Sequence, residues 1–256
     1  MVNELDDVTT RLADAGFIAA REEAEELLEY AEGDDLVLAS MIERRLRGEP
    51  LAWITGFALF CGMKIRIDRG VYVPRWQSEP LARRAATRLP ARGIAIDLCT
   101  GSGAIAKILQ LARPNARILA SDLNDGAVQC ASSNGVEVYP GDLFEPLPRG
   151  LERTVDVVVG IVPYVPTKSM SLLSRDTLTF ESTLSYDGGN DGADVLRRVV
   201  SDSSRYLRSG GALLIELGGD QVDVLMGDLI RHRFTDIKTL IDDEGDVRGL
   251  EATLHT

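Results

Sequence analysis

The stretch "AIDLCTGSGAIAKIL", residues 95–109, decides the fold of this chain. An apolar run leads into Asp97, a tight turn carries Gly101 and Gly103, and an apolar helix begins at once. Glycines in such a turn let the backbone approach a ligand closely, and the turn exposes amide N–H groups at the start of the helix. Many α/β loops carry a glycine pair, so this stretch alone predicts a strand, a turn and a helix, and only weakly a ligand site.

The sequence on either side repeats the alternation of strand and helix. We expect strands in "GIAIDLC", "ARILASDL", "VEVYPGD", "VDVVVGI" and "GALLIELG", with helical segments between them. This alternation predicts βαβ units and a parallel sheet that is covered on both faces. The ending "TDIKTLIDDEGDVRGLEATLHT" offers two strands around a charged turn and no helix. The last pair is therefore expected to be an antiparallel hairpin at the sheet edge.

The N-terminal part differs from the rest. Residues 3–47 place apolar side chains three or four positions apart, which predicts helices. The following "PLAWITGFALFCGMKIRIDRGVYVP" is rich in aromatic and β-branched residues and is interrupted by glycines, as expected of a hairpin connector. We predict a helical domain over residues 1–48, a β-hairpin linker over 49–73 and an α/β domain over 74–256.

Composition excludes several classes of function. The chain has 28 Lys and Arg against 40 Asp and Glu, a net charge of −12, which disfavours a broad grip on nucleic-acid phosphate. Its three cysteines, Cys61, Cys99 and Cys130, are scattered, and two histidines leave a metal few ligands. No apolar run approaches the length of a membrane span. We expect a cytoplasmic protein without a metal site and without a nucleic-acid or membrane partner.

Carboxylates stand at the ends of three successive predicted strands. Asp97 ends the first, Asp122 in "ILASDLN" ends the second about 20 residues after the turn, and Asp142 in "VYPGDLFEPL" follows the third. One such aspartate is often a helix cap or turn residue. Three in order favour a nucleoside cofactor, with Asp122 at the ribose and Asp142 at the adenine. The turn reads "CTGSGAIA" and lacks the third glycine of a dinucleotide site, which favours a methyl donor.

Seven segments in order carry a family resemblance: "VPRWQSE", "DLCTGSGAIA", "SDLN", "GDLFEPL", "VPYVP", "ESTLSYDGGNDGADVLRRVV" and "YLRSGGALLIELG". With "RRLRGEPLAWITGFALFCGMKIRIDRG" before them, the chain resembles the class I S-adenosylmethionine-dependent methyltransferases of the release-factor glutamine methyltransferase type, the HemK or PrmC group. The resemblance implies a Rossmann-like sheet of seven strands, S-adenosylmethionine as methyl donor and S-adenosylhomocysteine as product. It also implies a monomer whose helical domain recognises a protein substrate, a peptide chain release factor.

The resemblance also implies roles for individual residues. The donor is expected to contact Thr100, Gly101 and Gly103 in the turn, with Asp97 supporting that turn near the methionine end. The full set of expected donor-binding residues is Asp97, Thr100, Gly101, Gly103, Asp122, Leu123, Asp142 and Leu143. The acceptor is expected to contact Arg75, Trp76, Gln77 and Tyr164.

The acceptor loop departs from the family pattern. In "VDVVVGIVPYVPTKS", residues 155–169, Ile161 and Val162 stand where the family has Asn and the first Pro of N-P-P-Y, whereas Pro163 and Tyr164 match. In the family, the Asn side chain and a neighbouring carbonyl accept the two hydrogens of the substrate amide and orient its nitrogen. Isoleucine cannot accept a hydrogen bond, which leaves a buried polar group unpaired at a cost of roughly 1–3 kcal/mol. The family's "PRPETE" also becomes "PRWQSE" here.

Several functions remain open for the altered loop. Glutamine methylation is retained if Gln77 or Ser78 replaces the missing Asn. An altered acceptor, such as a carboxylate, an sp² carbon, an imine or a ring nitrogen of a small molecule or peptide, would suit an apolar wall of Ile161, Val162 and Tyr164. A degraded acceptor site would leave an interaction protein that only binds the donor. Nucleic-acid methylation is disfavoured by the acidic charge. Our prediction is a methyltransferase acting on a release-factor glutamine.

Overall fold

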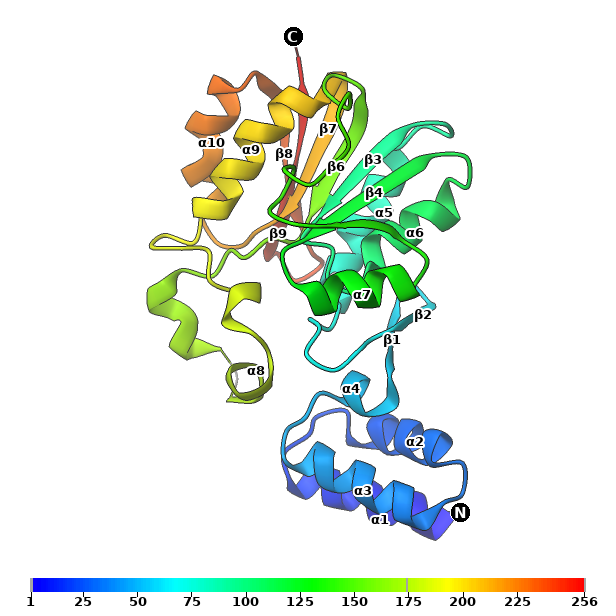
Figure 1. The fold of residues 1–256 in the computed structure, drawn as a ribbon. Helices are drawn as coiled ribbons and strands as arrows, with labels where there is room; N and C mark the ends of the chain where they lie inside the picture. Colours follow the sequence, from blue (N-terminus) through cyan, green and yellow to red (C-terminus); the bar gives the residue numbers. More distant parts are fainter. Residues whose placement is uncertain (1, 174, 256) are drawn as a thin grey trace.

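The computed structural model describes residues 2–173 and 175–255, and Figure 1 shows three parts that follow one another along the chain. Three helices form a unit at the N-terminal end. A short helix and a hairpin connect this unit to the rest, and an α/β domain completes the chain.

The N-terminal unit consists of α1 (Val2–Asp14), α2 (Ala20–Ala31) and α3 (Asp35–Leu46). Leu12, Leu27 and Ile42 lie at the centre of a small apolar core between the three helices. Asp34 caps α3, because its carboxylate accepts hydrogen bonds from the backbone N–H groups of Leu36 and Val37 at 2.9 and 3.1 Å. The helices expected over residues 3–47 are therefore present, and the unit lies apart from the sheet (Figure 1).

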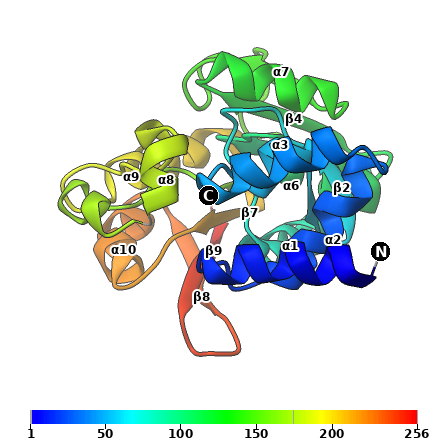
Figure 2. The ribbon, with the colours of Figure 1, turned by 90° about the horizontal axis from the view of Figure 1, so that it is seen from below.

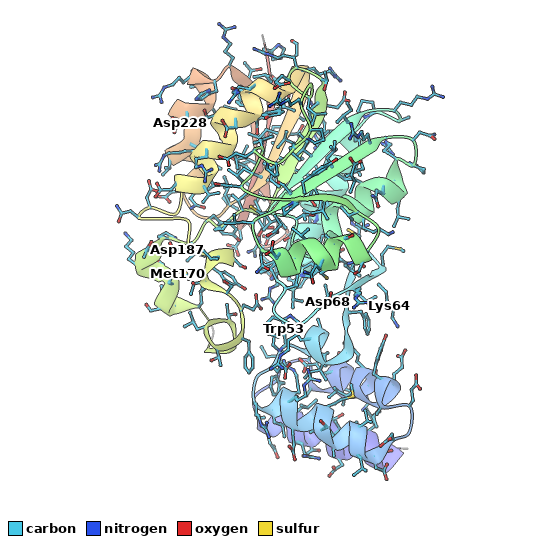
Figure 3. All side chains as sticks on the ribbon, viewed as in Figure 1. Trp53, Lys64, Asp68, Met170, Asp187 and Asp228 are labelled. Atoms are coloured by element: carbon cyan, nitrogen blue, oxygen red, sulfur yellow. The ribbon has the colours of Figure 1, made fainter. Side chains whose placement is uncertain are left out.

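The connector contains α4 (Leu51–Thr55), β1 (Phe57–Phe60) and β2 (Met63–Arg66). The antiparallel β1–β2 hairpin was expected, but the helix was not. Pro50 starts α4 and Gly56 ends it in the left-handed region, at φ +85°, where glycine is favoured. Trp53 lies at the junction (Figure 3) and its indole N–H donates to the carbonyl of Val71 at 2.8 Å. Burial of this large side chain explains why a five-residue helix forms here.

The α/β domain is built on one sheet of seven strands in the order β5-β4-β3-β6-β7-β9-β8. The strands are β3 (Ile94–Leu98), β4 (Arg117–Asp122), β5 (Glu137–Pro140), β6 (Val155–Gly160), β7 (Leu207–Glu216), β8 (Phe234–Ile241) and β9 (Val247–Leu254). The first five strands run parallel, and β9 is antiparallel to both β7 and β8. The antiparallel hairpin predicted for the end of the chain is confirmed, with β8 at the edge.

Helices cover both faces of the sheet (Figure 2). One face carries α5 (Glu79–Arg88), α6 (Ala104–Ala112) and α7 (Asp125–Ser133), and the other carries α9 (Asp194–Tyr206) and α10 (Gln221–Arg231). Neighbouring residues of β3 point into different layers: Ala95 belongs to the first core and Ile96 to the second. Both are fully buried, as expected of a central parallel strand.

A longer segment between β6 and α9 was not anticipated from the sequence. It contains η2 (Thr167–Leu172), α8 (Arg175–Phe180) and η3 (Thr183–Ser185), and we call residues 167–187 the arm. Figure 1 shows the arm extending beside the N-terminal unit, and Figure 3 shows Asp187 where it returns to the domain. There the Thr167 hydroxyl donates to Asp187 at 2.7 Å. In the part of the chain that the structure describes, no helix is long and apolar enough to cross a membrane.

Candidate active site

A cavity of about 260 Å³ opens at the carboxyl ends of the parallel strands. Its walls come from the loops after β3, β4, β5 and β6, together with the segment before the short helix η1 (Trp76–Ser78), the arm and α9. The carboxyl ends of parallel strands are where ligands bind in open α/β sheets, because the loops there converge on one edge. This cavity is therefore the candidate ligand site.

The glycine turn connects β3 to α6. Gly101 lines the cavity with φ +57°, but Gly103 does not line it. A Cβ atom on Gly103 would lie 2.9 Å from a methyl of Val136 and 3.1 Å from Cβ of Ala131, and the φ of Gly103 is +80°. Glycine is required at this position for close packing against α7 and the loop that follows it. Gly103 therefore has a packing role in the turn, and the donor contacts expected of Gly101 and Gly103 stay predictions.

Asp97 lies at the cavity and fixes the turn. One carboxylate oxygen accepts the Thr100 hydroxyl at 2.6 Å and the N–H of Ala106 at 3.1 Å. Burial raises the pKa of Asp97 to about 7, and the nearby charge of Asp122 adds to the rise. The Thr100 hydroxyl donates its proton inside the turn, so only its oxygen lone pairs remain for a ligand.

Asp122 joins the end of β4 to the glycine turn. Its two oxygens accept N–H groups from Gly101 at 2.8 Å and from Asn124 at 2.9 Å, and burial raises its pKa. Each carboxylate oxygen can accept a second hydrogen bond, so the side chain can still receive two neighbouring hydroxyls. This is the geometry that a ribose diol requires.

The third carboxylate, Asp142, accepts a hydrogen bond from Arg198 of α9 at 2.7 Å. Arg198 also lines the cavity, and the sequence prediction missed it because it lies on a helix far along the chain. Leu123 and Leu143 line the cavity as expected, the first 65 % exposed and the second buried. The carboxylate and the two leucines together suit a flat base with a polar edge.

The acceptor loop after β6 is only partly as predicted. Ile161 and Pro163 line the cavity. Val162 is 1 % exposed and packs in the core, outside the cavity lining, and its predicted place in the acceptor wall stays a prediction. Tyr164 also lies outside the cavity lining, and its hydroxyl donates to Glu216 at 3.0 Å. Tyr72, rather than Tyr164, is the tyrosine that lines the cavity.

The segment "PRWQSE" lies beside the cavity without lining it, apart from Pro74. Arg75 donates to Glu181 of the arm at 2.6 Å and to the Tyr186 hydroxyl at 3.3 Å, while Trp76 is 67 % exposed. Trp76 and Gln77 lie outside the cavity lining, and their contact with the acceptor stays a prediction. Ser78 is fully buried and donates to Glu216, so its hydroxyl does not replace the missing Asn.

One group of possible metal ligands lies away from the cavity. Within residues 2–173 and 175–255, the only set of three or more His, Cys, Asp or Glu side chains close enough together to hold an ion is Asp242, Glu244 and Asp246. They belong to the turn between β8 and β9, which Figure 2 shows projecting from the body of the protein, and Arg248 pairs with two of them.

Solved structures define the class of protein. The fold is similar to that of a methyltransferase from Pyrococcus furiosus, with a TM-score of 0.56 at 17 % identity over 85 % of this chain and 100 % of that one. It is also similar to the ribosomal protein L11 methylase of Lactobacillus delbrueckii, with a TM-score of 0.54 at 17 % identity over 75 % of this chain and 86 % of that one. Together with the strand order of the sheet, these likenesses show that the chain has the fold of the class I S-adenosylmethionine-dependent methyltransferases.

Curated relatives define the family. The release factor glutamine methyltransferase of Geobacter sulfurreducens is 33 % identical over 91 % of this chain and 89 % of the relative, and that of Mycolicibacterium smegmatis is 31 % identical over 97 % and 96 %. A 4-amino-L-phenylalanine/4-methylamino-L-phenylalanine methyltransferase of Streptomyces pristinaespiralis is 32 % identical over 87 % of this chain and 84 % of the relative. No protein-family model matches the chain.

The chain belongs to the release factor glutamine methyltransferase family. It is an enzyme that uses S-adenosylmethionine as its methyl donor. The family, fold class, enzyme class and donor predicted from the sequence are confirmed. The individual site residues and the acceptor belong to the proposals below.

Proposed function

We propose that this enzyme methylates the side-chain nitrogen of a glutamine in a peptide chain release factor. The observation that carries the proposal is the length of the match. Relatives named release factor glutamine methyltransferase align with 91 % and 97 % of the chain, which includes the helical unit as well as the catalytic domain. A chain that kept only donor binding would not need the helical unit.

The cavity residues fit the donor. Asp122 would accept the ribose hydroxyls, Asp142 the adenine amino group, and Leu123 and Leu143 would contact the adenine faces. Asp97 would hold the glycine turn beside the methionine end. When bound, S-adenosylmethionine supplies a methyl group made electrophilic by the sulfonium. The residues of the chain then have to orient the acceptor nitrogen and exclude water.

The loop after β6 would orient the methyl acceptor. Ile161 and Pro163 would confine the acceptor from one side and Tyr72 from another, so that the nitrogen faces the methyl group. Ile161 lines the cavity and offers no acceptor to an amide N–H of the substrate. We therefore expect glutamine transfer at a reduced rate.

The helical unit would bind the protein substrate. Residues 1–48 contain thirteen Asp or Glu and five Arg, a net charge of −8 out of −12 for the chain. A cleft of about 410 Å³ lies between this unit and the arm, with Glu26 and Arg45 on one side and Thr177 and Glu181 on the other. The acidic charge favours a partner with a basic face, and binding should weaken as salt is added.

A small amine is the second candidate acceptor. Ile161, Pro163, Tyr72 and Leu184 give the cavity a largely apolar acceptor end, and an amine needs no pair of amide acceptors. The Streptomyces pristinaespiralis relative, which is 32 % identical to this chain, is named for a free amino-acid substrate that carries such an amine.

One experiment separates the two acceptors. The purified enzyme is incubated with labelled S-adenosylmethionine and either the release factor of its own host or 4-amino-L-phenylalanine. Label on a release-factor glutamine, located by mass spectrometry, supports the first proposal. Label only on the small amine would replace it by the second.

A further inference from the structure

Tyr164 is held at both ends by buried side chains. Its hydroxyl donates to one oxygen of Glu216 at 3.0 Å, and its backbone carbonyl accepts the side-chain N–H of Gln221 at 2.8 Å. Glu216 is 7 % exposed and Gln221 is 5 % exposed. Since Tyr164 directly follows Pro163, these two contacts fix the loop whose residues Ile161 and Pro163 line the cavity.

Glu216 joins three segments of the chain. It ends β7, beside the end of β6. One of its oxygens accepts the Tyr164 hydroxyl and the other accepts the hydroxyl of Ser78, from the segment before α5, at 2.5 Å. Both partners donate, so an ionised carboxylate can accept from both, one at each oxygen. A protonated carboxyl would present its O–H, and a glutamine its NH2 group, to one of the two hydroxyls, which could then no longer donate to this side chain.

Gln221 completes the attachment with every polar group of its amide in use. Its nitrogen donates to the carbonyls of Tyr164 and Gly192, and its oxygen accepts the N–H of Gly218 at 3.1 Å. Gly192 has φ +77°, and a Cβ atom there would lie 2.4 Å from the Tyr164 carbonyl. The backbone of the loop is thus packed too closely to shift without breaking these contacts.

We propose that Glu216 is a positioning residue for methyl transfer, which acts through the Tyr164 hydroxyl to hold Ile161 and Pro163 at the acceptor end of the cavity. The proposal rests on the methyl transfer proposed above but not on the identity of the acceptor. A displacement of about 1 Å in such a loop can cost on the order of a hundredfold in rate, because the acceptor no longer faces the methyl group.

The ionisation of Glu216 gives the arrangement a pH dependence. Burial raises the pKa of Glu216, the Ser78 and Tyr164 hydroxyls lower it, and Arg248 of β9 is the cation that faces it. Tyr72 is the other titratable group close by. As the pH falls through the pKa of Glu216, the carboxyl gains a proton and one hydroxyl loses its acceptor. Turnover at saturating donor and acceptor should fall with it.

The test compares Glu216→Gln, Tyr164→Phe and the double variant. Each single variant should lower kcat about tenfold or more, leave the Kd for S-adenosylmethionine within about twofold, and abolish the acidic limb of the pH profile. The double variant should lose little more than either single one, because both remove the same contact. Glu244→Gln, an exposed carboxylate in the β8–β9 turn, is the matched control and should change none of these values.

A second measurement, amide hydrogen exchange, does not require a methyl acceptor. The N–H of Val165 bonds to the Tyr186 carbonyl and the N–H of Gly188 bonds to the Val165 carbonyl, so both amides report the order of the loop. Their hydrogen exchange should quicken in Glu216→Gln and in Tyr164→Phe. Unchanged exchange in both variants would overturn the proposal. Faster exchange in the variants supports the positioning role even if the native enzyme does not methylate a release factor. In that case only the proposed acceptor is refuted.

Discussion

Replacing Ile161 by asparagine tests the physical account of the acceptor loop. Ile161 is half-buried and lines the cavity, and its side chain offers no acceptor to an amide N–H. An amide N–H of the glutamine that faces Ile161 therefore remains unpaired. An unpaired buried donor costs roughly 1–3 kcal/mol, which corresponds to about five- to 150-fold in rate. Ile161→Asn should therefore raise kcat/KM for glutamine by a factor in that range.

The assay measures methyl transfer to the release factor and, separately, the Kd for S-adenosylmethionine by calorimetry. Ile161→Leu is the matched control, since leucine keeps the size and lacks the acceptor. The donor Kd should be the same in all three proteins. If asparagine gives no more transfer than leucine does, the missing hydrogen-bond acceptor does not limit the reaction and the reasoning is refuted.

Three further variants test the donor site and the turn that supports it. Asp122→Ala should weaken S-adenosylmethionine binding by at least about tenfold, because two ribose hydroxyls lose a charged acceptor; unchanged affinity in calorimetry would remove the ribose role. Asp97 has a folded pKa of about 7 against about 3.9 when unfolded, so the folded state binds more protons between these values and its stability falls as the pH rises through them. Between pH 5 and pH 8 the free energy of unfolding, measured with urea, should fall by less in Asp97→Asn than in the native chain, and the two falls should differ by a few kcal/mol at most. Equal falls in both proteins would contradict the buried carboxyl. Gly103→Ala should destabilise the fold by about 1–3 kcal/mol, since it has φ +80° and its Cβ would lie 2.9 Å from Val136; an unchanged melting temperature would show that the turn can relax.

Much of the framework could be predicted because local patterns determine it. The strand, glycine turn and helix around residues 95–109 were visible as a short apolar run followed by Gly101 and an apolar helix. The antiparallel end was visible because two strand patterns were separated by a charged turn and no helix. These features depend on neighbours in sequence, which a single chain displays directly.

Features that depend on distant contacts could not be predicted in the same way. Val162 and Ile161 are both apolar, and only the packing under the sheet decides that Val162 is buried in the core while Ile161 faces the cavity. Arg198 reaches Asp142 across 56 residues of sequence. Tyr164 was expected against the substrate, but a carboxylate from another strand draws its hydroxyl away from the cavity. The α4 helix was missed because its five residues read equally well as a strand.

The most direct test of the proposed function is the mass of the host release factor after incubation with the enzyme and S-adenosylmethionine at a concentration near the native Kd, with the weakly binding Asp122→Ala as the control. The account predicts one added methyl group on a glutamine, formed slowly by the native enzyme, faster by Ile161→Asn and more slowly than native by the control. An unmodified release factor with native enzyme that binds the donor normally would contradict it.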